Sequence, residues 1–369
     1  MTLNATSVLT IVQPKVVLAD PHILSDIRDR RSIIDAIYDA LVRRNDAGEF
    51  APWLATHWTV DSRCRQWRFT LRTDVQFHSG APLTARDAAA SLQRALSPEM
   101  PGELGTQGVL RGYLEGVNIT AQDDHHLLIE TRQPFADLLD LLVDIPVVQA
   151  DALPDRLVGS GPWQPLRQHF DTLIMQAFAR HWAGAPPAET LIWRAEPDAR
   201  RRLSMLAQGE ADIAVDVSAQ EAGNITWVKQ KSYLCVIFLF NLFQGPMRDV
   251  RVRQAINHAV NLTTVIDDPA VAAGQADALA GPLSPRHPGT PATLAPYAFS
   301  PERARQLLAE AGYAAGLSLD IALPARFPDE SIALADNIAR QLGEVGIQVN
   351  LSVGHDRPAY AQRVRDKQF

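Results

Sequence analysis

Cysteine is scarce in this chain, with only Cys64 and Cys235 among 369 residues. Two distant cysteines with no spacing motif give little support for a disulfide, even in an oxidising compartment. We therefore expect no disulfide framework. With 46% hydrophobic and 21% charged residues, a chain of this length can bury sizeable cores and is expected to form two or three domains.

Long apolar runs are also missing. No window reaches the roughly 20 apolar residues that a membrane-spanning helix needs, which predicts a soluble chain. Residues 1–14 lack the basic n-region, the long apolar core and the small-residue cleavage site of a signal peptide. The sequence therefore fits either the mature form of an exported protein or a cytoplasmic protein.

A basic excess is lacking too. Lys and Arg number 35 against 42 Asp and Glu, for a formal net charge of -7. This argues against nucleic acid or an anionic membrane as the main partner, because both need a concentrated basic surface. The longest basic run is Arg200 to Arg202. With Leu203, Leu206 and Ala207 as the buried stripe beside it, we expect this run to be a solvated helix face.

Signatures of catalysis are absent: there is no G-x-S-x-G elbow, no phosphate loop and no H-E-x-x-H metal helix. Gly159 and Gly161 make only a G-x-G, and the proline that follows suits a tight turn better than a dinucleotide-binding helix. His125 and His126 follow two aspartates, but adjacent side chains on a strand point to opposite faces, so one metal ion cannot easily take both. We expect no enzyme, no cofactor and no metal site.

The segment from Phe50 to Leu96 has the clearest local pattern. Trp67, Phe69 and Leu71 alternate with polar residues at the two-residue period of a half-buried strand. Thr84, with Asp87 three residues later, is a capping-box variant that predicts a helix start. This helix would bury Ala85, Ala88, Ala89 and Leu92 against the strands and leave Arg86, Gln93 and Arg94 in solvent.

The C-terminal part alternates strands with helices. Residues 317–323 and 347–353 show strand alternation, and an apolar helical stripe over 335–342 lies between them. Ser300 and Pro301 open an earlier helix that Gly312 closes, and another helix begins near Pro358. This order predicts a βαβ unit and a mostly parallel α/β sheet.

Several short segments follow one another in a fixed order. They are the 50–96 segment, ADPH at 19–22 with IYDAL at 37–41, GSGPW at 159–163, ARHWAG at 179–184, EPD to LAQGEADI over 196–213, and NLF with DVRVRQAINHAV over 241–260. In this order they resemble the motifs of the extracellular solute-binding proteins of family 5, the peptide, nickel and opine type. The resemblance covers nearly all of the chain.

The resemblance implies a periplasmic binding protein-like type II α/β fold, in which two lobes with mixed sheets close on a ligand by a hinge. Residues 1–45 and 155–243 would form lobe I, 46–154 a small domain inserted into it, and 244–369 lobe II. Family members continue well beyond residue 369. We therefore expect lobe II to be incomplete, ligand binding to be weakened or lost, and apolar surface to be exposed.

The resemblance also implies which residues line the ligand crevice. The candidates are Asp20, His22, Gly161, Trp163, Asn241 and Phe243, the last two at the end of a crossover strand. Trp163 and Phe243 would pack on the ligand, and Asn241 offers a donor and an acceptor. Each has a structural alternative: Trp163 packed inside its lobe, Asn241 bonded to backbone, and Asp20 stabilising its own turn instead of pairing with a ligand amine.

The function implied is that of the solute-binding component of an ABC import system. It would act as a periplasmic monomer that captures a peptide or peptide-like small solute and delivers it to permease subunits. The alternative is a cytoplasmic ligand-sensing domain of a transcription regulator with the same fold. Such regulators begin with a helix-turn-helix domain, whereas this chain begins with the strand Val8 to Val12. Fold alone does not choose among peptides, nickel complexes, opines and sugars.

Overall fold

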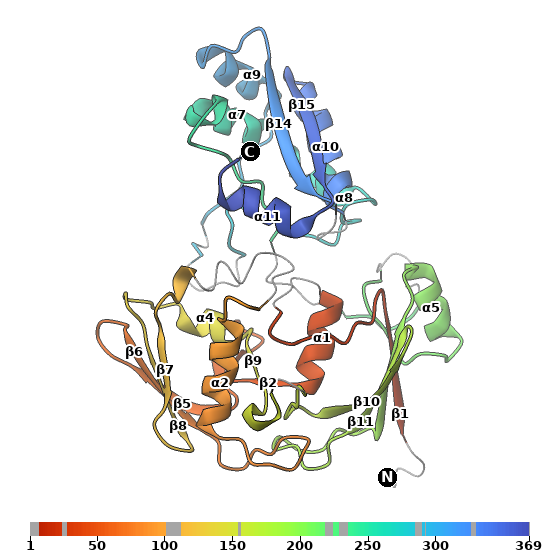
Figure 1. The fold of residues 1–369 in the computed structure, drawn as a ribbon. Coiled ribbons are helices and arrows are strands. Elements are labelled where there is room, and N and C mark those ends of the chain that lie inside the picture. The colour runs from red at the N-terminus through yellow and green to blue at the C-terminus, as the bar shows by residue number, and fades with distance from the viewer. Residues whose placement is uncertain are drawn as a thin grey trace. The chain divides into compact units, whose positions relative to one another are not determined.

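The computed structural model describes residues 7–23, 28–100, 112–153, 156–217, 224–228, 235–284, 290–291, 293–325 and 330–368. The chain divides into two compact units, Met1–Trp227 and Val228–Phe369. Figure 1 labels most of their helices and strands. We describe each unit by itself.

Unit 1 has a five-stranded mixed sheet with the order β10-β11-β12-β1-β13. The predicted first strand is confirmed as β1, which runs parallel to both β12 and β13, while β10, β11 and β12 are antiparallel. Helix α1 lays Ile33, Ile34 and Ile37 into the core of this sheet. The bounds are β1 Val8–Gln13, α1 Arg28–Ile37, β10 Trp163–His169, β11 Thr172–Ala177, β12 Thr190–Ala195, α5 Ala199–Ala207 and β13 Ile213–Ala214.

A second, antiparallel sheet of unit 1 has the order β5-β6-β8-β7. As predicted, Trp67, Phe69 and Leu71 are buried, and α2 packs its alanines and Leu92 into the same core. The backbone amide of Thr84 donates to the Asp87 carboxylate at 2.8 Å, so the expected helix start is confirmed. The bounds are β5 Ala55–Val60, β6 Gln66–Leu71, α2 Ala85–Ala95, β7 Asn118–Ala121 and β8 His126–Glu130.

Unit 1 also contains two short, two-stranded sheets. Strand β2 pairs with β9, and β3 pairs with β4, both antiparallel. In Figure 1, β2 and β9 lie between α2 and α1. The bounds are β2 Asp39–Ala40, β3 Val42–Arg44, β4 Phe50–Pro52, α4 Leu138–Leu142, β9 Pro146–Val147 and η1 Ala150–Ala152.

The basic run on α5 differs from its prediction. Arg202 is buried, with 3% of its surface exposed, and Ala207 is exposed. The guanidinium replaces water with backbone oxygens, which satisfies its donors inside the unit. It donates to the carbonyls of Glu196, Pro197, Val215 and Asp216 at 2.6 to 2.9 Å.

Unit 2 contains the predicted βαβ arrangement: β14 and β15 are parallel, and α10 connects them. The predicted helix after Ser300 is α9, whose N-cap serine accepts from the amide of Arg303, and the helix expected near Pro358 is α11. The bounds are η2 Pro246–Arg248, α7 Val250–Ala259, α8 Leu262–Asp267, α9 Pro301–Glu310, β14 Leu317–Pro324, α10 Ser331–Gly343, β15 Ile347–Gly354 and α11 Arg357–Arg365.

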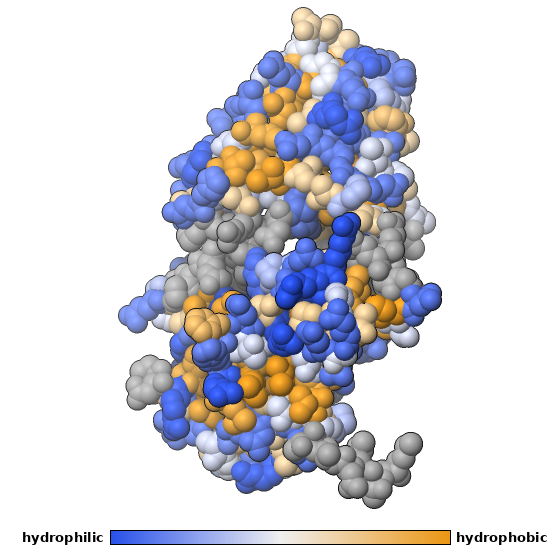
Figure 2. Space-filling view, turned by 90° about the vertical axis from the view of Figure 1, so that its right-hand side faces the viewer, coloured by the Kyte–Doolittle hydropathy of each residue, from blue (hydrophilic) through white to orange (hydrophobic). Residues whose placement is uncertain are grey.

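The expected crossover strand ending at Phe243 is not formed: residues 235–243 carry neither helix nor strand. A strand needs a partner backbone, and none of the described residues pairs with this segment. Its apolar side chains are exposed, among them Val236, Leu239 and Phe243. Figure 2 shows apolar patches interspersed with hydrophilic residues on the face that it views. Among the described helices, none is long and apolar enough to cross a membrane.

Candidate ligand-binding site

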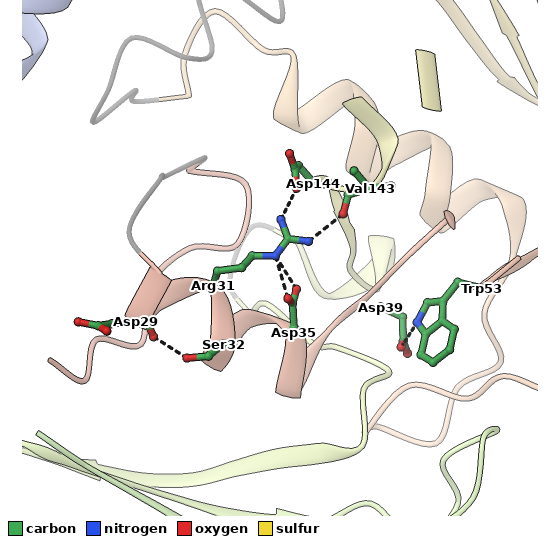
Figure 3. Close-up of polar contacts among 8 residues, drawn as sticks. All are labelled: Asp29, Arg31, Ser32, Asp35, Asp39, Trp53, Val143 and Asp144. Atoms are coloured by element: carbon green, nitrogen blue, oxygen red, sulfur yellow. Dashed lines mark hydrogen bonds and ion pairs between the residues drawn. The ribbon is translucent and has the colours of Figure 1, made fainter. Parts of the chain in front are cut away.

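A buried carboxylate, that of Asp39, joins several of the sequence motifs. Asp39 is 2% exposed. Its Oδ1 accepts from the indole of Trp53 at 2.7 Å (Figure 3), and its Oδ2 accepts from Ser160 at 2.7 Å and from Trp182 at 3.4 Å. The His181 Nε2 lies 3.9 Å from Oδ2. The IYDAL, GSGPW and ARHWAG segments therefore meet at one anion.

The two indoles that bind Asp39 also contact each other. Their rings lie edge to face with centroids 4.6 Å apart. The guanidinium of Arg43 lies 4.0 Å from the centroid of the Trp53 ring, and that of Arg72 lies 4.1 Å from the Trp182 ring. Cations over aromatic faces are attracted by the ring quadrupole. One arginine therefore lies over each of the two indole rings. The Asp39 network links separate segments of the fold to one another.

The GSGPW turn packs on the end of α1, and this contact explains both of its glycines. A Cβ at Gly159 would lie 2.1 Å from the carbonyl oxygen of Ile37, and a Cβ at Gly161 would lie 2.6 Å from the carbonyl carbon of Ile37. The amide of Gly161 donates to that Ile37 oxygen at 2.9 Å. The carbonyl of Gly161 lies 2.9 Å from the His78 Nε2, and burial lowers the pKa of His78. Close backbone packing therefore requires glycine here.

Asp20 and His22 lie in a second network, centred on Arg94 of α2. The Arg94 guanidinium binds both Asp20 carboxylate oxygens, at 2.9 and 2.5 Å, and its Nη1 lies 2.8 Å from the His22 Nδ1. The other ring nitrogen of His22 lies 2.8 Å from the carbonyl oxygen of Pro146. The prediction that Arg94 lies in solvent is wrong, because its side chain is 22% exposed and pairs with Asp20.

The charges of this network shift one another's pKa. Burial opposes the ionisation of Asp20, but hydrogen bonds from Arg94 and the His22 amide outweigh it and hold the Asp20 pKa below its ordinary 3.8. Burial lowers the pKa of His22 below 6.5, and the charge of Arg94 lowers it further. The hydrogen bonds to Asp20 raise the pKa of Arg94. The network thus favours Asp20 ionised, Arg94 charged and His22 neutral.

Arg31 of α1 makes a similar bridge (Figure 3). Its Nε donates to both oxygens of Asp35, at 2.7 and 2.9 Å, its Nη1 pairs with Asp144, and its Nη2 donates to the Val143 carbonyl at 2.9 Å. Burial raises the pKa of Asp35, and the nearby Asp144 and Asp39 add to this rise against the opposing effect of Arg31. Arg31 therefore ties α1 to the turn after α4.

Trp163 opens β10 and is 8% exposed. Its side chain belongs to the core of the mixed sheet, together with Ile33 and Ile37 of α1. The sequence left two roles open for Trp163, contact with the ligand or packing inside its lobe. Its burial in this core corresponds to packing.

The candidates Asn241 and Phe243 belong to unit 2. Asn241 Oδ1 accepts from the amide of Phe243 at 3.0 Å, and its Nδ2 donates to the Lys367 carbonyl at 3.3 Å. The Phe243 ring is 69% exposed, and the ammonium of Lys367 lies 3.9 Å from its centroid. Of the six candidates, Phe243 presents the largest exposed apolar face.

The structure thus brings Asp20 and His22 together, places Gly161 and Trp163 in one turn at the mixed sheet, and places Asn241 with Phe243. Sequence reasoning missed the central roles of Asp39, Arg94 and Arg31. Asp39 lies inside a recognised segment, so its position was a signal, but nothing in the sequence named its partners. Across the described residues, no group of three or more His, Cys, Asp or Glu could hold a metal ion.

Comparisons with known proteins agree with this fold. The family model of the bacterial extracellular solute-binding proteins, family 5 Middle, matches residues 49–369. The chain is 27% identical to the dipeptide-binding protein of Escherichia coli (strain K12), over 89% of this chain and 68% of that protein. It is 26% identical to heme-binding protein A of Haemophilus influenzae, over 89% and 66%. It therefore spans about two thirds of the length of these curated relatives.

A solved structure shows the same architecture. NikA from Brucella suis in complex with Fe(III)-EDTA aligns with a TM-score of 0.77 at 23% identity, over 98% of this chain and 78% of that one. The expected type II periplasmic binding protein fold is confirmed by this similarity.

Proposed function

Because the chain belongs to family 5 of the bacterial extracellular solute-binding proteins, we propose that it is the solute-binding component of an ABC import system. It captures a peptide or peptide-like small solute in the periplasm, as a monomer, and delivers it to the membrane permease. The observation that carries this proposal is the family match over residues 49–369. The relatives named dipeptide-binding and heme-binding protein support a carrier of small solutes over an enzyme.

The domain division that goes with this function is also a proposal. Residues 1–45 and 155–243 form lobe I, 46–154 the inserted domain and 244–369 lobe II. The separate antiparallel sheet of β5 to β8 supports an inserted domain, because it has its own apolar core.

The six candidate residues divide into two proposed roles. Phe243 and Asn241 contact the solute directly, since the phenyl ring is exposed and an amide side chain can both donate and accept. Asp20, His22, Gly161 and Trp163 shape the surface that the solute meets. Their side chains or backbone are already engaged inside unit 1, so their contribution to binding is to hold the two turns in place.

Thermal unfolding of the protein expressed from its complete gene, in the presence of a solute panel, tests the proposal. The panel holds dipeptides, tetrapeptides, a nickel–histidine complex, an opine, heme and a sugar, each added to protein that has been unfolded and refolded to remove carried-over solute. A solute at about 100 times its dissociation constant stabilises the native state by about 2.7 kcal/mol, which raises the melting temperature by several degrees. We expect one peptide-like class to do this. Stabilisation by none of the classes contradicts the proposal.

A matched variant separates binding from general stability. Phe243→Ala removes an exposed ring and is expected to weaken binding without lowering the melting temperature of the solute-free protein. Leu166→Ala, which removes a side chain 58% exposed on β10, is the control and leaves binding unchanged.

A further inference from the structure

The turn Asp20–Pro21–His22 follows the loop after β1 and is held by residues from other parts of unit 1. Arg94 of α2 holds the Asp20 carboxylate through two nitrogens and contacts the His22 ring through one of them. His22 is 0% exposed, and its amide donates to Asp20 Oδ1 at 2.9 Å. Arg94 therefore binds both the carboxylate and the ring of this turn.

The donors and acceptors of this network fix the tautomer of His22. A guanidinium can only donate, so the His22 Nδ1, 2.8 Å from Arg94 Nη1, must accept. The ring proton then lies on Nε2, which donates to the Pro146 carbonyl at 2.8 Å. Both ring nitrogens are used, and the arrangement holds for neutral histidine alone.

Burial and the charge of Arg94, which faces His22 from α2, oppose a second proton on its ring and outweigh the Pro146 carbonyl and the Asp20 carboxylate, which favour one. Arg30 of α1 donates to the Asp20 carbonyl at 3.3 Å. The Tyr38 hydroxyl, after α1, stays neutral because burial raises its pKa. A proton on Nδ1 would turn its lone pair into a donor that points at the Arg94 guanidinium, which breaks one hydrogen bond and sets two cations against each other.

We propose that this turn is an acid-sensitive latch, with Arg94 as the positioning residue that holds Asp20–Pro21–His22 against α2 only while His22 is neutral. The link to solute capture rests on the proposed function, which places this turn at the surface that the solute meets. The latch itself does not. Acidification then loosens the turn and reduces the stability of unit 1.

The direction of the pH dependence follows from proton linkage. The pKa of His22 in the folded chain lies below the ordinary 6.5, first because of burial. As the pH falls below 6.5, the unfolded chain binds a proton at this position before the native chain does, so the native state loses stability until the pH reaches the folded value. Above 6.5 neither state carries the proton, and the contribution is complete.

Nitrogen-resolved NMR of the histidine rings in the full chain is the first test. At neutral pH we expect His22 to show a protonated Nε2 and an unprotonated Nδ1, and to stay neutral below the ordinary histidine pKa of 6.5. Substitution Arg94→Lys keeps the charge but loses the planar fork, so we expect the His22 titration to move up toward its ordinary value. A His22 ring that carries its proton on Nδ1, or titrates at or above the ordinary 6.5, overturns the proposal.

Urea unfolding between neutral pH and about pH 5 gives the second test. Tryptophan fluorescence reports on unit 1, because the seven tryptophans of the chain all lie at or before Trp227. We expect the unfolding midpoint of the wild-type chain to fall on acidification and His22→Gln to reduce that fall. The remainder comes in part from His78, whose pKa burial also lowers. An unchanged fall in His22→Gln overturns the latch. Neither test uses a solute, so failure of the proposed function would leave both results intact.

Discussion

Ser160 donates a hydrogen bond to Asp39 at 2.7 Å although 121 positions separate the two residues in the chain. The same carboxylate accepts from Trp53 and Trp182, which come from two further segments. A carboxyl group that is almost fully buried needs such donors, because a buried polar group without a hydrogen-bond partner is destabilising. Three of the family motifs of this chain therefore meet at Asp39, and their hydrogen bonds to it hold unit 1 together.

Substitution Asp39→Ala should lower the free energy of unfolding of unit 1 by about 3 kcal/mol, since it removes the acceptor of the buried Ser160 hydroxyl and of two partly buried indole donors. Urea unfolding followed by tryptophan fluorescence measures this change. Asp171→Ala, at an exposed position in the turn between β10 and β11 of the same unit, should change stability by less than about 0.5 kcal/mol. A loss below about 1 kcal/mol for Asp39→Ala would show that these hydrogen bonds are dispensable.

Substitution Gly161→Ala should destabilise unit 1 by about 2 kcal/mol, because its Cβ would meet backbone atoms of Ile37 and Tyr38 that cannot move aside. Gly343→Ala is the matched control: its Cβ would have nothing within 4 Å, and alanine gains about 0.5 kcal/mol over glycine in a helix. Fluorescence follows the first variant and far-ultraviolet circular dichroism the second. Equal effects from the two substitutions would refute the packing explanation.

The carboxylate of Asp249 should titrate far below its usual range. Hydrogen bonds from the Arg251 side chain, and then from its backbone amide, lower the Asp249 pKa to about 2. The N-cap of α7 is therefore intact above pH 3.8 and is lost only as the pH falls through about 2. NMR titration of the carboxyl carbon measures this value. In Arg251→Gln the midpoint should rise toward 3.8, and a wild-type midpoint at 3.8 or above would contradict the ion pair.

The exposed apolar side chains of segment 235–243 should bind hydrophobic dyes. Leu239 and Phe243 are 72% and 69% exposed, and Val236, Ile237 and Leu242 lie beside them in sequence. Exposed apolar side chains bind hydrophobic dyes. We expect Leu239→Lys to reduce dye binding, and Leu166→Lys, at an exposed leucine of β10, to leave it unchanged. A larger loss of dye binding in Leu166→Lys than in Leu239→Lys would argue against dye binding by segment 235–243.

Local elements could be predicted from the sequence because their determinants lie within a few residues. Thr84 and Asp87 fix the start of α2, and Ser300 with Pro301 fixes the start of α9. The alternation in 317–323 and 347–353, with a helical stripe between them, was enough for the parallel pair β14 and β15. Each of these follows from spacing alone.

Long-range pairing could not be predicted. Arg94 and Arg202 lie on helix faces that periodicity assigns to solvent, yet one binds a carboxylate 74 positions away and the other four backbone carbonyls. Periodicity predicts which face of a helix a residue occupies. It does not predict which groups a long guanidinium side chain contacts. The segment ending at Phe243 has the composition of a strand, but pairing depends on a partner that composition does not supply.

Native mass spectrometry of the protein expressed from its complete gene, purified without unfolding and gently ionised, tests the central claim most directly. We predict a monomer that carries one discrete added mass, which disappears after unfolding and refolding and matches a peptide or peptide-like solute. A bare polypeptide mass for folded protein, together with no added mass after incubation with each member of the solute panel, would contradict the assignment of a solute-binding function.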